Sequence, residues 1–200
     1  MAAKRAIDIV GAGFALVVLS PLLLVLAAAV VVDTGRPVLF CQTRLGRGLR
    51  EFRVLKFRTM KLGSAPDMHM EYIAKLATGQ ADEEGLKKLT ADPRVTAVGR
   101  FLRKTSLDEL PQLVNVLLGN MSLVGPRPAL EYELQHYRDT HYERFAVKPG
   151  MTGLWQVSGR NTLGFTEMLD LDAEYARSGT FLTDLKILAK TPGAAISGAA

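Results

Sequence analysis

Between Asp8 and Asp33 the chain carries no charged side chain over 24 residues. As a straight helix this run would measure about 36 Å, which is enough to cross the hydrocarbon core of a bilayer. Ser20 and Pro21 interrupt its middle. Because proline lacks an N–H and clashes with the carbonyl four residues earlier, we expect a break there, where the Ser20 hydroxyl can bind a freed backbone group. The segment therefore either crosses a membrane or enters it and turns back.

Basic residues flank this segment at both ends. Lys4 and Arg5 precede it. The residues that follow it are Arg36, Arg44, Arg47, Arg50 and Arg53. Because positive residues near a membrane segment favour the cytoplasmic side, a spanning helix would leave one basic end outside. A helix broken at Ser20 and Pro21 keeps both ends inside, and each half, about 18 Å long, is too short to span alone.

The basic flanks and the length of the apolar run decide among three interpretations of the segment. We favour a re-entrant membrane helix over residues 1–34, with the rest of the chain on the cytoplasmic face. A single-pass helix stays open, because kinked spanning helices tolerate a proline. A cleaved signal peptide is disfavoured, because the apolar core of such a peptide is usually only about 7–15 residues long.

The rest of the composition is that of an ordinary soluble domain with a basic balance. The chain has 200 residues and a formal net charge of +5, which suits anionic partners such as phosphates, acidic lipid or nucleic acid. Cys41 is the single cysteine, so no intramolecular disulfide can form, and the three histidines lack the spacing of zinc ligands. We expect a catalytic domain over residues 35–191 and a disordered tail over 192–200.

The expected fold class is α+β, mainly helical, with one short β-hairpin. Residues 37–60 are rich in Val, Leu and Phe around Gly46 and Gly48, which predicts two extended segments joined by a glycine turn. The period of two along the second segment would place Lys56 and Arg58 on one face. The other expected elements are a surface loop with short helices over 63–90, a helix ending near 104, a helix over 106–118 that stops at Gly119, an amphipathic helix over 130–145, a non-helical glycine-rich stretch over 148–161, and helices over 165–179 and 181–190.

Asp108 and Glu109 are adjacent at the start of one of these predicted helices. Ser106 and Glu109 have the spacing of a capping box, and acidic residues in a first turn stabilise a helix by roughly 0.3–1 kcal/mol. An ionised Asp among cations can instead attack phosphorus or bind a divalent metal. Capping and catalysis both remain open from these residues alone.

Five basic residues make a candidate phosphate-binding cluster. Arg127 lies between two prolines in the sequence GPRP, so its guanidinium leaves a stiff backbone, and such a fork suits phosphate oxygens. Arg160 follows a glycine in SGRN, where the backbone can approach a ligand closely. The cluster comprises Lys56, Arg58, Arg103, Arg127 and Arg160. Spacing does not show whether these side chains converge, and a structural turn is the alternative at Arg127.

Together these segments resemble the monotopic phosphoglycosyl transferases, the bacterial sugar transferases that begin glycan assembly on a polyprenyl carrier. The resemblance covers nearly the whole chain, and its long central block is specific. The motifs that carry it are KRAIDIVGAGFALVVLSPLLLV, RLGRGLREFRVLKFRTM, DPRVTAVGRFLRKTSLDELPQLVNVLLGNMSLVGPRP, KPGMTGLWQVSGRN and FLTDLKIL.

The resemblance implies a reaction and a set of roles. A UDP-sugar would give its sugar 1-phosphate to polyprenyl phosphate, such as undecaprenyl phosphate, with release of UMP and with Mg²⁺ as cofactor. Asp108 would be the nucleophile of a covalent phosphosugar intermediate and would contact the Mg²⁺, with Glu109 as its acidic partner. The five basic residues would match positions near the family's active site. The reaction would initiate glycan, exopolysaccharide or O-antigen assembly.

The resemblance also implies where the protein works. Ser20 and Pro21 would form the break of the family's re-entrant helix, so the protein would be monotopic in the bacterial inner membrane, in contact with lipid, with its catalytic domain on the cytoplasmic face. It would be a minimal catalytic form without further membrane spans. A homodimer stays open, and the sugar and the glycan pathway cannot be read from the sequence.

Two interpretations from other classes compete with this one. The basic balance would suit a membrane-anchored nucleic-acid-binding module, but no aromatic–basic RNA motif accompanies it, and we expect no nucleic-acid partner. A non-catalytic scaffold of the same fold is disfavoured by the presence of both Asp108 and Glu109.

Overall fold

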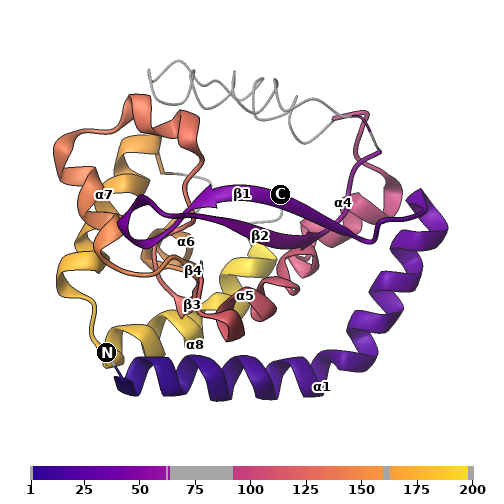
Figure 1. Cartoon of the computed structure of the whole chain (residues 1–200), viewed down its shortest axis with the longest axis horizontal. Coiled ribbons are helices and arrows are strands. Elements are labelled where there is room, and N and C mark those ends of the chain that lie inside the picture. The colour runs from indigo at the N-terminus through magenta and orange to yellow at the C-terminus, as the bar shows by residue number, and fades with distance from the viewer. Residues whose placement is uncertain (1, 62, 64–91, 160–162, 198–200) are drawn as a thin grey trace.

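A computed structural model describes residues 2–61, 63, 92–159 and 163–197 of the chain (Figure 1). The helices are α1 (Ala2–Thr34), α4 (Ala97–Lys104), α5 (Gln112–Leu118), α6 (Leu154–Ser158), α7 (Phe165–Ser178) and α8 (Phe181–Ser197). The 3₁₀ turns are η1 (Arg47–Leu49), η2 (Leu107–Glu109), η3 (Glu131–His136) and η4 (Asp139–Ala146). The strands are β1 (Leu39–Leu45), β2 (Glu51–Phe57), β3 (Ser122–Val124) and β4 (Gly150–Thr152). The mainly helical architecture and the helices expected near 104, 165–179 and 181–190 are confirmed.

α1 is the long apolar helix that the sequence predicts, and it bends instead of ending at the expected break (Figure 1). Ser20 Oγ donates a hydrogen bond to the Val17 carbonyl at 2.8 Å. That carbonyl lies four residues before Pro21. In an uninterrupted helix it would accept a hydrogen bond from the N–H of residue 21, which proline lacks. The predicted compensating role of Ser20 is therefore confirmed. In the described part of the chain, α1 is the one helix long and apolar enough to cross a membrane.

Three polar side chains tie the start of α1 to the rest of the fold. Lys4 Nζ lies 2.6 Å from the carboxylate of Asp184 in α8. Asp8 is buried and accepts a hydrogen bond from Ser122 Oγ at 2.9 Å. Arg5 donates to two backbone carbonyls at the end of α5, where helix carbonyls lack intrahelical partners. The basic residues that serve as a topology signal in the sequence thus also hold α1 in place.

The opposite end of α1 is held by Arg58, which follows β2 directly. Its guanidinium is buried and donates to the carbonyls of Thr34 and Gly35. Both ends of α1 are therefore bonded to the same folded domain, around which the helix wraps (Figure 1).

The predicted hairpin is confirmed. β1 and β2 pair in antiparallel fashion, with Arg44 opposite Phe52. Gly48 in the connecting turn has φ of +67°, a left-handed conformation that favours glycine. Val54 of β2 packs into a buried cluster with Ala12 of α1, so the hairpin and the apolar helix share one core.

The amphipathic helix expected over 130–145 is wrong, because the 3₁₀ segments η3 and η4 occupy this stretch. Glu133 accepts a hydrogen bond from the Leu130 N–H, and His141 Nδ1 accepts one from the Arg138 N–H. Side chains that bind the backbone locally compete with the hydrogen bonds of an α-helix.

Three further stretches have a prediction from the sequence that can be compared with the structure. The glycine-rich segment 148–161, expected to be non-helical, contains the strand β4 and the short helix α6. α8 continues through Pro192 to Ser197, whereas the sequence predicts disorder from that proline onward. The loop predicted over 63–90 lies, apart from Gly63, outside the described residues.

Candidate active site

The acidic pair lies in a turn between α4 and α5. Ser106 has φ of +56°, in the left-handed region, and its side chain makes no capping hydrogen bond. The predicted capping box is therefore wrong, and Asp108 and Glu109 lie in the 3₁₀ turn η2. α5 begins only at Gln112 and ends at Gly119 as predicted. Because α5 begins after both carboxylates, neither Asp108 nor Glu109 lies in its first turn, as the capping interpretation requires.

Asp108 is a buried carboxylate surrounded by charge. It is 9% exposed, and burial raises the pKa of Asp108 to about 6. Lys56 and Arg103 act to lower this pKa, while the neighbouring Glu109 acts to raise it. At neutral pH the carboxyl group is mostly ionised yet poorly solvated, which suits a nucleophile.

Glu109 is neutralised by a cation from the hairpin. Its Oε1 lies 2.6 Å from Nζ of Lys56, near the end of β2. Lys56 is also the cation that most strongly stabilises ionised Asp108. One lysine therefore serves both carboxylates, and it fixes η2 against the hairpin.

Arg103 reaches the acidic turn from the last turn of α4. Its Nε donates to Thr59 Oγ1 at 2.9 Å. α4 can approach this closely because Gly99 has no side chain: a Cβ there would lie 2.1 Å from the Thr59 carbonyl oxygen. Burial lowers the pKa of Arg103, and Asp108 and Asp92 oppose this shift. The contact with Thr59 thus positions the guanidinium near Asp108.

Arg127 lies in the turn after β3, and two paired strands fix that turn. β3 and β4 run parallel, and a Cβ on Gly150 would lie 2.0 Å from the Gly125 nitrogen. The Gly150 N–H also donates to the Pro126 carbonyl at 2.8 Å. The backbone at Arg127 is therefore held by hydrogen bonds as well as by the prolines.

A buried ion pair lies directly behind this turn. Arg144 donates to the Arg127 carbonyl at 2.6 Å and to the Asp172 carboxylate at 2.6 Å. The Arg144 and Asp172 side chains are 3% and 2% exposed. The hydroxyl of Tyr137 is a further partner of Arg144. The sequence did not predict this pair. Arg144 and Asp172 lie in segments expected to be amphipathic helices, and no neighbouring residue indicates that their charged side chains are buried.

Arg44 is a second cation of the site that sequence reasoning missed, treating it only as a membrane flank. It is buried and donates to Gln42 Oε1 at 2.7 Å and to the Pro128 carbonyl at 3.0 Å. Burial lowers the pKa of Arg44 to about 10, Arg127 lowers it further, and Glu133 most strongly opposes this shift. Arg44 therefore lies beside the Arg127 turn, and two neighbouring guanidinium groups favour an anion. The position of Arg44 in a predicted hairpin strand, directly after the polar residues Gln42 and Thr43, could have indicated this role from the sequence.

Among the four predicted cations that the structure describes, Arg58 does not join the group around Asp108. Lys56 and Arg103 lie beside Asp108, whereas Arg58 is bonded to the end of α1. Lys56 binds Glu109 in η2, whereas Arg58 binds the carbonyls of Thr34 and Gly35, so the two cations hold different parts of the fold. Arg160 lies outside the described residues. A substrate contact by Arg58 or Arg160 stays a prediction.

A divalent cation would find few protein ligands at this site. Within the residues that the structure describes, no group of three or more His, Cys, Asp or Glu side chains is placed to hold a metal ion. Mg²⁺ is usually bound by one or two carboxylates together with substrate phosphates. The neighbouring carboxylates of Asp108 and Glu109 fit that arrangement, with a diphosphate supplying the remaining oxygens.

Comparison with known proteins gives the family. The model of the bacterial sugar transferase family matches residues 1–198 of the chain. The chain belongs to the bacterial sugar transferase family. The chain is 46% identical over 188 residues to the undecaprenyl-phosphate galactose phosphotransferase of Salmonella typhimurium. It is 42% identical over 193 residues to the UDP-glucose:undecaprenyl-phosphate glucose-1-phosphate transferase of Escherichia coli, and 40% identical over 189 residues to the exopolysaccharide production protein ExoY of Rhizobium meliloti.

These matches cover the chain almost completely but cover its relatives unequally. They include 94%, 92% and 94% of this chain, in the order given. The chain spans 39% of the Salmonella relative and 38% of the Escherichia relative, but 83% of ExoY. The resemblance stated from the sequence motifs is confirmed at the level of the family.

Proposed function

We propose that this sugar transferase moves a sugar 1-phosphate from a UDP-sugar to polyprenyl phosphate and releases UMP. The observation that carries the proposal is the buried carboxylate of Asp108 beside Lys56 and Arg103. Such cations stabilise the negative charge that develops when a carboxylate attacks a diphosphate. The names of the Salmonella and Escherichia relatives support undecaprenyl phosphate as the acceptor and a UDP-hexose as the donor.

The chemistry proceeds in two displacements at one phosphorus. A carboxylate oxygen of Asp108 attacks the sugar-linked phosphorus, and the bond from that phosphorus to the bridging oxygen breaks, so that UMP leaves with that oxygen. The sugar phosphate is then an acyl phosphate on Asp108. A phosphate oxygen of the polyprenyl carrier attacks the same phosphorus, forms the lipid diphosphate sugar and frees the carboxylate. This product would initiate glycan or exopolysaccharide assembly.

The surrounding residues have separate tasks in this proposal. Lys56 forms an ion pair with Glu109 and stabilises the charge on Asp108. Arg127, in the turn after β3, and Arg44, in β1, bind phosphate oxygens with the bidentate geometry that guanidinium offers. Mg²⁺, held by Asp108 and Glu109 together with the donor phosphates, would supply further charge neutralisation.

A screen of UMP release across several UDP-sugars tests the proposed function. With polyprenyl phosphate and Mg²⁺ present, at least one donor should give many turnovers of UMP release, and the lipid should gain the sugar phosphate. Omitting the acceptor should prevent multiple turnovers. Absence of lipid product with every donor, from protein shown to be folded, would contradict the proposal. A positive screen would also name the sugar.

We further propose that the protein is monotopic, with both ends of α1 on the cytoplasmic face of the inner membrane. The support is that Lys4 and Asp8 at one end of α1 and Arg58 at the other bind the same domain. A spanning helix would have to break one of these sets of contacts. Exposed apolar residues in both halves of the bent helix, such as Phe14 (70% exposed) and Leu24 (72%), would then lie in lipid.

Cysteine labelling in intact cells tests this topology. In a Cys41→Ser background, we expect Ala3→Cys and Thr43→Cys each to resist an impermeant maleimide added from outside. Both positions are exposed in the fold, so both should react once the membrane is permeabilised. Labelling of either position before permeabilisation would contradict the re-entrant helix.

A further inference from the structure

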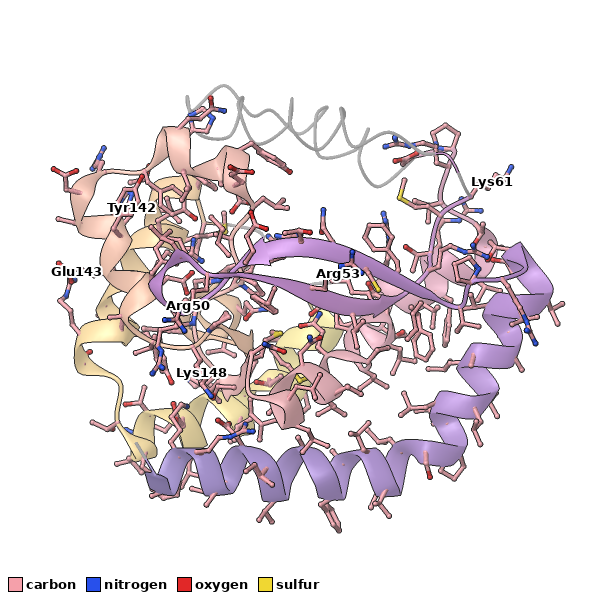
Figure 2. All side chains as sticks on the ribbon, viewed as in Figure 1. Arg50, Arg53, Lys61, Tyr142, Glu143 and Lys148 are labelled. Carbon is pink, nitrogen blue, oxygen red and sulfur yellow. The ribbon has the colours of Figure 1, made fainter. Side chains whose placement is uncertain are left out.

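The turn of the β-hairpin forms one wall of an open groove that the proposed reaction does not use. The groove has a volume of about 360 Å³ and lies between this turn, the end of α5 and the segment before β4. Its charged lining residues are Arg47, Arg50, Glu51 and Lys148. Figure 2 shows Arg50 and Lys148 close together at the turn end of the hairpin, with Arg53 farther along it.

This groove is separate from the acidic pair. Glu51 at the groove and Lys56 at the active site lie five residues apart on β2. Strand residues rise about 3.3 Å each, so roughly 16 Å of strand separates the two places. The cations of the groove therefore do not bind the phosphorus that Asp108 would attack.

Several positive charges converge at the groove. A Cβ on Gly119 would lie 3.3 Å from a guanidinium nitrogen of Arg5 and 3.4 Å from Nζ of Lys148, so two cations flank one glycine. Burial lowers the pKa of Lys148, and Arg5 and Arg47 lower it further, against an opposing effect of Asp8. Like charges held this close repel one another, and an anion between them would remove that repulsion.

Two exposed leucines are adjacent in the chain to residues that line the groove. Leu49 in the hairpin turn is 42% exposed, and Leu118 at the end of α5 is 71% exposed. The exposed apolar surface of α1 begins two residues after Arg5, with Ile7 (38%), and continues with Ile9 (45%) and Val10 (71%). A cationic groove next to an apolar surface suits a ligand that has a phosphate at one end and hydrocarbon at the other.

We propose that this groove binds the phosphate group of an anionic membrane lipid, with Arg47, Arg50 and Lys148 as its ligands. The phosphate lies between the three cations, and the acyl chains continue over Leu118 toward the apolar surface of α1. The bound lipid holds the hairpin turn and the start of α1 at the membrane surface. This site is additional to the donor and acceptor sites of the proposed transferase reaction and does not depend on that reaction.

Thermal unfolding of the full chain in a neutral detergent tests the proposal, because a ligand that binds only the folded state raises the melting temperature. The probes are short-chain phosphatidylglycerol, short-chain phosphatidylcholine and inorganic phosphate. The groove variant is Arg47→Gln with Lys148→Gln. The matched control, Arg53→Gln with Arg138→Gln, removes the same charge from exposed positions that do not line the groove.

Saturating phosphatidylglycerol should raise the melting temperature of the wild type and of the control by roughly 4 °C or more. The groove variant should show less than half of that shift, and phosphatidylcholine should have little effect on any of the three. An equal shift in all three proteins, or no shift in the wild type, would overturn the site. If inorganic phosphate raises the melting temperature as much as phosphatidylglycerol does, the lipid assignment is overturned. The groove would then bind a soluble phosphate compound. If the groove variant is unstable without ligand, the single variant Arg50→Glu replaces it, and it should abolish the increase in melting temperature with phosphatidylglycerol.

Discussion

Replacing Asp108 with asparagine is expected to stop sugar-phosphate transfer and, at the same time, to raise the melting temperature. Transfer stops because an amide is neither a comparable nucleophile nor a good magnesium ligand. Stability rises because burial makes ionised Asp108 unfavourable in the fold, as its pKa of about 6 against the ordinary 3.8 reflects. The gain should be about 1–3 kcal/mol at neutral pH. In a chain of this size, each kcal/mol changes the melting temperature by roughly 2–4 °C.

The pH dependence of this gain has a definite sign. Because the folded pKa of Asp108 lies above the unfolded one, the ionisation cost is complete above about pH 6, shrinks as the pH falls and vanishes below about pH 4. Melting temperatures of the wild type and Asp108→Asn should therefore differ at neutral pH and converge near pH 4. Glu109→Gln is the control, since it removes the ion pair with Lys56 and should not stabilise the protein. A constant difference at all pH values would contradict a buried, titrating Asp108.

Replacing Arg144 with methionine should destabilise the protein by about 3–5 kcal/mol, the usual cost of leaving one partner of a buried ion pair uncompensated. The change strands the Asp172 carboxylate and removes the donor to the Arg127 carbonyl. The melting temperature should fall by roughly 6–20 °C. Adding Asp172→Leu to Arg144→Met should recover much of the loss, because the stranded charge is then gone.

The exposed pair between Arg177 and Glu143 provides the matched control. These side chains are 54% and 43% exposed, and an arginine is again bound to a carboxylate, at 2.9 Å. Arg177→Met should cost at most about 1 kcal/mol, because solvent screens exposed ion pairs. Thermal unfolding of the two variants side by side measures the difference. Equal losses would mean that Arg144 and Asp172 do not form a buried pair in solution.

Features of the fold that have a local cause could be predicted from the sequence. The apolar run gives α1, and the bond from Ser20 to the Val17 carbonyl follows from the chemistry of the neighbouring Pro21. The hairpin follows from strand-forming residues around glycines, and Gly119 ends α5 because it can take a left-handed φ of +87°. Each of these features is decided by residues adjacent in the chain.

The features that escaped prediction depend on contacts between distant residues. Arg58 is drawn to carbonyls at the end of α1, 23 and 24 residues earlier in the chain, which no strand period indicates. Arg144 and Asp172 are 28 residues apart, and only the packed fold shows that both are buried. The burial that perturbs Asp108 likewise comes from elements on several sides. For this reason Asp108 could be proposed as the nucleophile from the family resemblance, whereas its surroundings could not be predicted.

The most direct test of the account is the first displacement without an acceptor. Purified protein is mixed with Mg²⁺ and a UDP-sugar that supports turnover, and polyprenyl phosphate is left out. If Asp108 forms a covalent phosphosugar, UMP should appear up to about one equivalent of enzyme, the protein should carry the labelled sugar phosphate, and added polyprenyl phosphate should discharge that label into lipid. Asp108→Asn should give neither UMP nor labelled protein. A wild-type enzyme that releases no UMP until acceptor is added, and never carries label, would contradict Asp108 as the nucleophile.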